Sequence, residues 1–98
     1  MKYTFQQFIE SLGSDRPLAG LAPPLAGLWW DAKGDWDRAH KCVDHLEDRG
    51  GMRVHAYLHR KEGDLGNAAY WYRQVGRSAP DLTLEAEHDL LVKELLAD

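Results

Sequence analysis

KGDWDRAH at residues 33–40 and EGDLGNAA at residues 62–69 are the two segments that decide the fold of this chain. Gly, Asp, a large apolar residue and Ala recur in the same order, 29 residues apart. Gly accepts the positive φ that ends one helix, and Asp is a preferred N-cap for the next. The apolar residue, Trp36 or Leu65, is expected to fill the corner between the two helices, and Ala lets them approach. Each segment therefore predicts the turn of a helical hairpin.

Apolar spacing on either side of these turns follows the helical period of i, i+3, i+4 and i+7. Thr4 and Gln7 form a capping box, and Gly50-Gly51 is expected to separate the two hairpins. The predicted helices lie at about residues 4–12, 23–33, 36–49, 52–62, 65–75 and 83–96. The sequence thus predicts one all-α domain over residues 1–98. It has about six short antiparallel helices, with hairpins at about 24–49 and 52–76 between an N-terminal and a C-terminal helix.

Composition restricts the class of protein. The chain has 98 residues, 44% of them hydrophobic, and a formal net charge of −4, which suits one small globular domain. The acidic balance disfavours nucleic-acid and anionic-membrane partners. The longest apolar stretch, residues 18–30, holds two prolines and is too short to span a bilayer. A single cysteine, Cys42, excludes an internal disulfide, so we expect a cytoplasmic protein.

The repeated pattern, a small residue followed by Gly-Asp-apolar-x-x-Ala, resembles the helix-turn-helix unit of tetratricopeptide and Sel1-like repeats over about residues 23–76. That resemblance implies a short solenoid that binds a protein or peptide or self-associates as a homodimer. A closer resemblance rests on HAYLHRKEGD at residues 55–64, NAAYWYR at 67–73 and WDAKGDW at 30–36. These strings are similar to a family of small hypothetical proteins of unknown function, which implies no activity.

His55 and His59 are spaced four residues apart, so one face of a helix can present both imidazoles. Such a pair could hold a transition metal with a third ligand, for which His40 is the nearest candidate and Asp44 or Glu47 are alternatives. The simpler interpretation is a pair of partly buried imidazoles that hydrogen-bond to nearby carbonyls or carboxylates. No cofactor is expected on that interpretation, and a metal at His55 and His59 is the alternative.

Tyr70, Trp71, Tyr72 and Arg73 follow one another on a predicted helix and cannot all face one core. An exposed aromatic beside an arginine suits a peptide or small ligand, and packing on a terminal helix or a dimer interface is the alternative. The candidate ligand- or partner-binding residues are His40, His55, His59, Arg60, Tyr70, Trp71 and Arg73.

Charged residues around the two turns are expected to form a solvated network of salt bridges. They are Asp31, Lys33, Arg60, Lys61, Glu62 and Asp64. The sequence favours a protein- or peptide-interaction module and predicts no catalytic residue. The alternative is a small ligand-binding protein, metal-binding protein or enzyme with a His/Tyr/Arg pocket between the hairpins.

Overall fold

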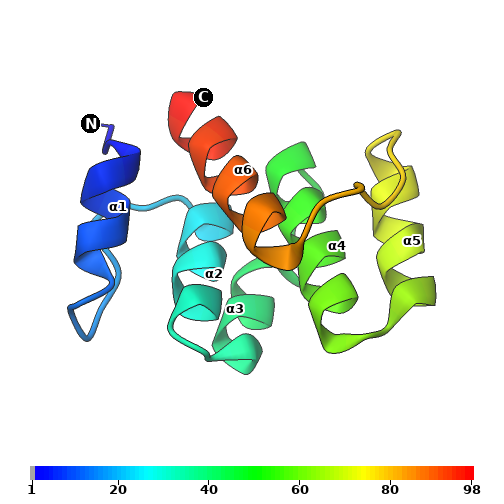
Figure 1. Cartoon of the computed structure of the whole chain (residues 1–98), viewed down its shortest axis with the longest axis horizontal. Coiled ribbons are helices and arrows are strands. Elements are labelled where there is room, and N and C mark those ends of the chain that lie inside the picture. The colour runs from blue at the N-terminus through cyan, green and yellow to red at the C-terminus, as the bar shows by residue number, and fades with distance from the viewer. Residues whose placement is uncertain (1) are drawn as a thin grey trace.

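A computed structural model describes residues 2–98, which form six helices and no strand (Figure 1). The helices are α1 (Phe5–Ser11), α2 (Pro23–Ala32), α3 (Trp36–Val43), α4 (Arg49–Glu62), α5 (Leu65–Gln74) and α6 (Leu84–Ala97). The predicted all-α class is confirmed. Helices α2 and α3 form one hairpin, α4 and α5 form the next, and the two hairpins stack side by side. No helix in residues 2–98 has the length and apolar character needed to cross a membrane.

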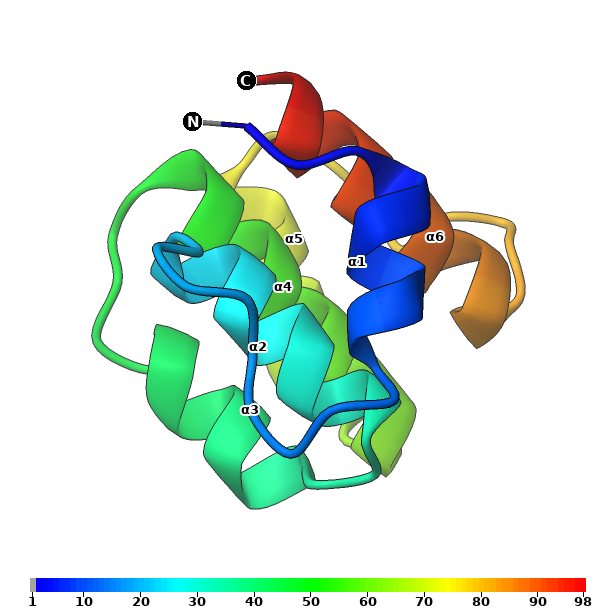
Figure 2. The same cartoon turned by 90° about the vertical axis from the view of Figure 1, so that its left-hand side faces the viewer.

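The terminal helices cover one side of this stack. Helix α6 packs on α2 and α4, and α1 packs on α6. Seen from the end of the stack, α1 and α6 lie on one side of α2, and α3 lies on the other (Figure 2). Helix α4 is therefore surrounded by α2, α3, α5 and α6, and its residues from Val54 to His59 are all buried. Polar side chains in this helix must consequently find partners inside the protein.

The main hydrophobic core lies where α1, α2, α4 and α6 meet. Its largest fully buried side chains are Phe8, Leu28, Trp29, Tyr57, Leu58 and Leu91. Burying each side chain of this kind contributes about 1.5–3 kcal/mol. Because α6 supplies Leu91 and its neighbours, the C-terminal helix is part of the core that holds the first hairpin against the second.

The two hairpin turns have the predicted chemistry. Gly34 and Gly63 adopt φ of 85° and 91°, which an L side chain rarely does. The Asp35 and Asp64 carboxylates accept from the backbone N–H three residues later, at 3.0 and 3.2 Å. The expectation for Leu65 was wrong, because its side chain is 66% exposed. Helix α5 stands at the end of the stack, so no further helix within residues 2–98 covers that corner.

The boundary between the hairpins also differs from the prediction. Helix α3 ends at Val43, and Gly50-Gly51 lies in the first turn of α4 instead of before it. The Asp48 carboxylate caps α4 by accepting from the Gly51 N–H at 3.3 Å. A Cβ at Gly51 would lie 2.5 Å from the Cβ of Leu46. Glycine is therefore needed here for the close approach of the connecting segment, not for a break.

Candidate metal centre

Three histidines meet where α3 lies against α4. His55 and His59 are one turn apart on α4, and His40 faces them from α3. The three ring centres lie 4.8 to 5.2 Å from one another, and one ring nitrogen from each lies within 4.8 Å of the other two. His55 and His59 are only 5% and 6% exposed, and His40 is half-buried. We call these three residues the histidine cluster.

Two tryptophans pack against the histidine cluster. Trp36 stacks on His40 with ring centres 4.8 Å apart, and its Nε1 donates to the Leu58 carbonyl at 2.8 Å. Trp71 stacks on His55 with ring centres 4.3 Å apart. These contacts restrict the rotation of both imidazoles. They also explain one of the three consecutive aromatic residues on α5, since Trp71 turns toward the cluster.

Hydrogen bonds satisfy the histidine cluster only in part. His59 Nδ1 lies 2.6 Å from Glu62 Oε2, and with Nδ1 donating to this carboxylate a neutral ring keeps its lone pair at Nε2. The Nε2 atoms of His40 and His55 lie 3.1 Å apart, so one ring must donate and the other accept. His55 Nδ1 is buried without a hydrogen-bond partner in residues 2–98. The simpler interpretation of bonded imidazoles thus describes His59 and leaves out one nitrogen of His55.

The surroundings of His55 favour its neutral form. Burial, together with the positive charge that His59 and His40 can carry, lowers the pKa of His55 to about 4. The Asp44 carboxylate, at the end of α3, acts in the opposite direction. A neutral imidazole is the form that ligates metals.

The separations match those that a tetrahedral ion requires. With Zn–N bonds of about 2.0–2.1 Å, two ligating nitrogens lie about 3.3 Å apart and the centres of their rings about 5 Å apart. The 3.1 Å distance between His40 and His55 is close to the first value, and the ring centres match the second. The nitrogen of the third histidine lies within 4.8 Å of the other two.

Other residues predicted for the site lie elsewhere. The Arg60 guanidinium points to the α6 side of α4, where Nη1 lies 2.7 Å from Glu87 Oε1 and Nη2 donates to the Leu82 carbonyl. Tyr70 is 47% exposed and meets Trp71 edge-on, and Arg73 is exposed. The structure therefore brings together His40, His55, His59 and Trp71, and it does not bring Arg60 into that group.

The sequence did not lead us to expect two buried carboxylates, those of Asp31 and Glu87. Asp31 was expected in a solvated network but is 3% exposed, and it accepts from the Tyr57 hydroxyl at 2.7 Å and from Lys61 Nζ at 2.8 Å. Glu87 is 4% exposed and accepts from the Tyr72 hydroxyl at 2.6 Å as well as from Arg60.

A signal for both carboxylates was present in the sequence. Asp31 follows Leu28 by three residues, and Glu87 follows Leu84 by three, so each acid lies on the apolar stripe of its helix. Burial and the bond to each carboxylate raise the pKa of both Tyr57 and Tyr72, so both phenols remain donors. The two acids are therefore structural partners of the tyrosines.

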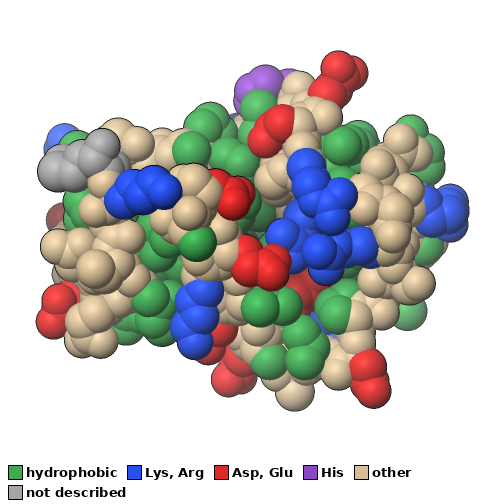
Figure 3. Space-filling model, turned by 90° about the horizontal axis from the view of Figure 1, so that it is seen from above, with side chains coloured by type: hydrophobic (Ala, Val, Ile, Leu, Met, Phe, Trp, Pro, Cys, Tyr) green, Lys and Arg blue, Asp and Glu red, His purple; other side chains and the backbone are tan. Residues whose placement is uncertain are grey.

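Basic side chains gather on the face that includes the C-terminal end of α6, next to acidic ones (Figure 3). Two arginines of α4 are held there by bonds within the chain. Arg49 Nη1 donates to the Val75 carbonyl at 3.0 Å, and Arg53 Nη2 lies 2.7 Å from Glu94 Oε1. These guanidinium groups tie α4 to the end of α5 and to α6.

Comparison with family models, curated proteins and solved structures gave no match. The resemblance to tetratricopeptide and Sel1-like repeats therefore stays a prediction.

Proposed function

We propose that this protein binds a divalent transition metal ion, with Zn²⁺ as the closest fit, at His40, His55 and His59. The observation that carries the proposal is the meeting of three imidazole nitrogens from two helices within 4.8 Å. An array of neutral nitrogen donors is the ligand set that zinc and its neighbours in the periodic table prefer.

Each residue of the site has a distinct role in this proposal. His59 ligates through Nε2, and Glu62 holds the opposite nitrogen and so orients the ring. His40 and His55 ligate through the two Nε2 atoms that already face each other. Trp36 and Trp71 hold two of the rings in place by stacking.

Three protein ligands leave a fourth position for water or an external ligand. The ion joins α3 of the first hairpin to α4 of the second, so it stabilises the contact between the hairpins. The proposal also includes a cytoplasmic location, which the single cysteine, Cys42, led us to expect.

The test is a zinc titration of the chelator-treated protein, read by isothermal calorimetry and by native mass spectrometry. We expect one ion per chain and the loss of binding in His55→Ala and in His59→Ala. His45→Ala is the matched control, because His45 is an exposed histidine on the segment that follows α3. Circular dichroism of each variant shows whether it remains folded.

Cobalt(II) provides an independent readout of the coordination sphere. A tetrahedral site with nitrogen ligands gives visible absorption bands that are far more intense than those of the octahedral aquo ion. Zinc binding that survives in the folded His55→Ala and His59→Ala variants, or that is lost equally in His45→Ala, would contradict the proposal.

A second candidate is the interaction module favoured by the sequence. The observation that supports it is the outer face of α5, where Leu65 is 66% and Tyr70 is 47% exposed at the end of the helical stack. Terminal units of a solenoid need a polar cap or a neighbour, and a second copy of the chain would supply one. Sedimentation equilibrium tests this. We expect a concentration-dependent dimer in the wild type and a monomer in Tyr70→Lys, whereas a wild-type monomer at all concentrations contradicts it.

A further inference from the structure

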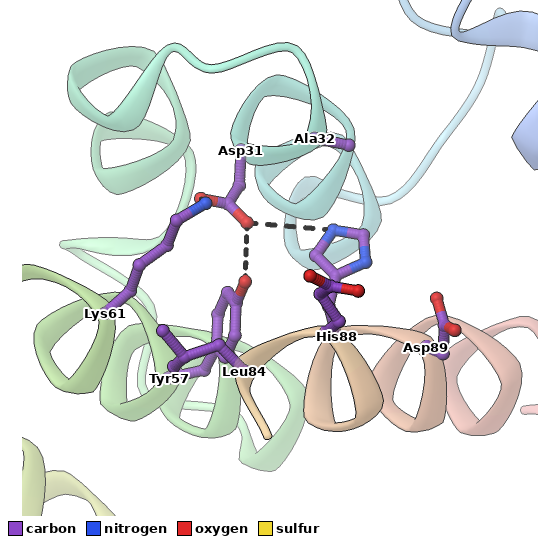
Figure 4. A pocket seen from close by; sticks show the side chains of 8 residues that line it. Asp31, Ala32, Tyr57, Lys61, Leu84, His88 and Asp89 are labelled. Atoms are coloured by element: carbon purple, nitrogen blue, oxygen red, sulfur yellow. Dashed lines mark hydrogen bonds and ion pairs between the residues drawn. The ribbon is translucent and has the colours of Figure 1, made fainter.

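An open pocket of about 430 Å³ lies on the other side of α4 from the histidine cluster, between α2 and the first turns of α6. Its polar lining consists of Asp31, Tyr57, Lys61, Glu85, His88 and Asp89. Figure 4 shows Tyr57 and Lys61 of α4 converging on Asp31 of α2, with His88 of α6 opposite them. A volume of this size suits a small organic molecule.

The inner wall of the pocket already holds one ammonium group. The side chain of Asp31 is only 2% exposed, and its Oδ1 lies 2.8 Å from Lys61 Nζ. Its Oδ2 accepts from the Tyr57 hydroxyl at 2.7 Å. The Lys61 side chain is 39% exposed and reaches Asp31 along the pocket, so an ammonium from solvent can follow the same path.

His88 adds an acceptor to the pocket. Its Nε2 donates to the Leu28 carbonyl at 2.8 Å, which leaves the lone pair of the neutral ring on Nδ1. The Nε2 atom also lies 3.8 Å from Asp31 Oδ2. The bond to the α2 backbone therefore sets which nitrogen of His88 remains free to meet a ligand.

The remaining polar groups of the pocket are acceptors as well. Glu85 and Asp89 stand one turn apart on α6, and both are exposed. Asp31 and Lys61 cancel in charge, so the lining carries a net charge of about −2 while His88 is neutral. A ligand that satisfies these groups must bring positive charge and N–H donors.

We propose that this pocket binds a small organic cation through a primary ammonium group. The ammonium donates to His88 Nδ1 and to the carboxylates of Glu85 and Asp89. A quaternary ammonium fits poorly, because it has no N–H and because the ring of Tyr57, only 2% exposed, presents no open aromatic face. The pocket shares no residue with the histidine cluster, so ammonium binding can be present or absent whether or not the protein binds a metal.

The test is an NMR titration of the full chain at pH 8, where histidine is neutral, with 1,4-diaminobutane as the probe. We expect saturable shifts of amide signals at the first turns of α6 and the end of α2. Choline, which has the charge without the donors, and butyrate, which has the opposite charge, are expected to bind at least about tenfold more weakly. Equal affinity for choline, or no saturation by the diamine, overturns the proposal.

Two variants locate the binding. Glu85→Gln/Asp89→Asn is expected to weaken diamine binding about tenfold, because it removes both carboxylates that accept from the ammonium. Glu10→Gln/Asp15→Asn removes the same charge from exposed positions outside the pocket and serves as the matched control. Equal weakening in both double variants reduces the effect to overall charge and overturns the proposal.

A third variant, Lys61→Met, tests whether an ammonium from solvent can also enter the pocket as far as Asp31, where Lys61 Nζ lies in the wild type. It leaves the Asp31 carboxylate without its cation, so butylamine is expected to bind this variant more tightly than the wild type and to raise its melting temperature. Thermal unfolding in butylamine and in choline at equal ionic strength measures this. A rise of equal size with both cations contradicts a specific ammonium site.

Discussion

Helix α4 has two polar sides, which differ in whether their buried polar groups have all their hydrogen-bond partners. Toward α2 and α6, the carboxylates of Asp31 and Glu87 are each bonded to a tyrosine hydroxyl and a basic side chain at 2.6 to 2.8 Å. Toward α3 and α5, the histidine cluster leaves His55 Nδ1 without a partner and sets two like nitrogens 3.1 Å apart. Both sides are buried within one small domain.

The difference separates polar groups with a full set of partners from polar groups with an incomplete one. A buried carboxylate with every strong partner in place holds the helices together, and removing it leaves its donors unpaired. A buried imidazole whose Nδ1 has no partner costs stability, and the Nε2 atoms of His40 and His55 satisfy only each other. The free energy of unfolding should therefore depend on substitutions on the carboxylate side. On the histidine side it should depend on pH and on metal.

The largest effect is expected from Asp31→Ala. This change leaves the Tyr57 hydroxyl and the Lys61 ammonium without their shared acceptor, so the free energy of unfolding should fall by about 4 kcal/mol. Urea denaturation followed by circular dichroism measures it. Asp15→Ala, at an exposed loop position, is the control and should stay within about 0.5 kcal/mol of the wild type. Similar losses in both variants would show that Asp31 is not a structural partner.

Acid should destabilise the metal-free protein through His55. The unfolded chain takes up a proton near the ordinary pKa of about 6.5, whereas the folded chain does so only near a pKa of about 4. Above pH 6.5 the ring is neutral in both states. Between these values the unfolded state binds more protons, so stability falls with decreasing pH by about 3 kcal/mol in total.

The measurement is urea denaturation from pH 7.5 to pH 4 in the presence of a chelator. His55→Gln should lose this part of the pH dependence, and His45→Gln should keep it, since His45 is exposed. A slope that is unchanged in His55→Gln would mean that His55 is not held neutral by the fold.

Zinc should stabilise the histidine side. At a free concentration one hundred times the dissociation constant, a ligand that binds only the folded state adds about 2.7 kcal/mol to the free energy of unfolding. Thermal unfolding with and without zinc measures this gain, which should vanish in His59→Ala. The same rise in wild type and variant would place the ion elsewhere.

A smaller effect is expected when a phenol loses only its hydroxyl. Tyr57→Phe and Tyr72→Phe each remove one hydrogen bond to a buried carboxylate that keeps its basic partner, so each should cost about 1.5–2 kcal/mol. Tyr3→Phe, whose hydroxyl donates to the Ala19 carbonyl in an exposed setting, should cost less. Equal costs in all three variants would show that burial does not distinguish these bonds.

Local sequence was a good guide where neighbours along the chain act on one another. The capping box of Thr4 and Gln7 starts α1 as predicted, and Asp35 and Asp64 cap α3 and α5. The spacing of His55 and His59 placed both rings on one face of α4, and stacking of the hairpins indicated His40 as their neighbour. The caps and the shared face of His55 and His59 depend only on residues close along the chain, whereas His40 also required the two hairpins to stack.

Sequence reasoning failed where partners come from distant helices. The bond between Arg60 and Glu87, the burial of Asp31 and the role of His88 all depend on where α6 packs. The exposure of Leu65 also depends on how the helices pack, because within residues 2–98 no helix covers it beyond α5. The turn pattern alone could not distinguish it from Trp36, which packs against the core.

The sequence by itself determined the number of helices, the two Gly-Asp turns and the face on which two histidines stand, because capping, glycine conformation and helical spacing act within a few residues. It did not determine the connection between α3 and α4. Only the tertiary structure decided which buried polar groups are satisfied. That outcome depends on a donor and an acceptor up to 60 residues apart, such as His88 and Leu28, arriving within hydrogen-bonding distance when the helices pack.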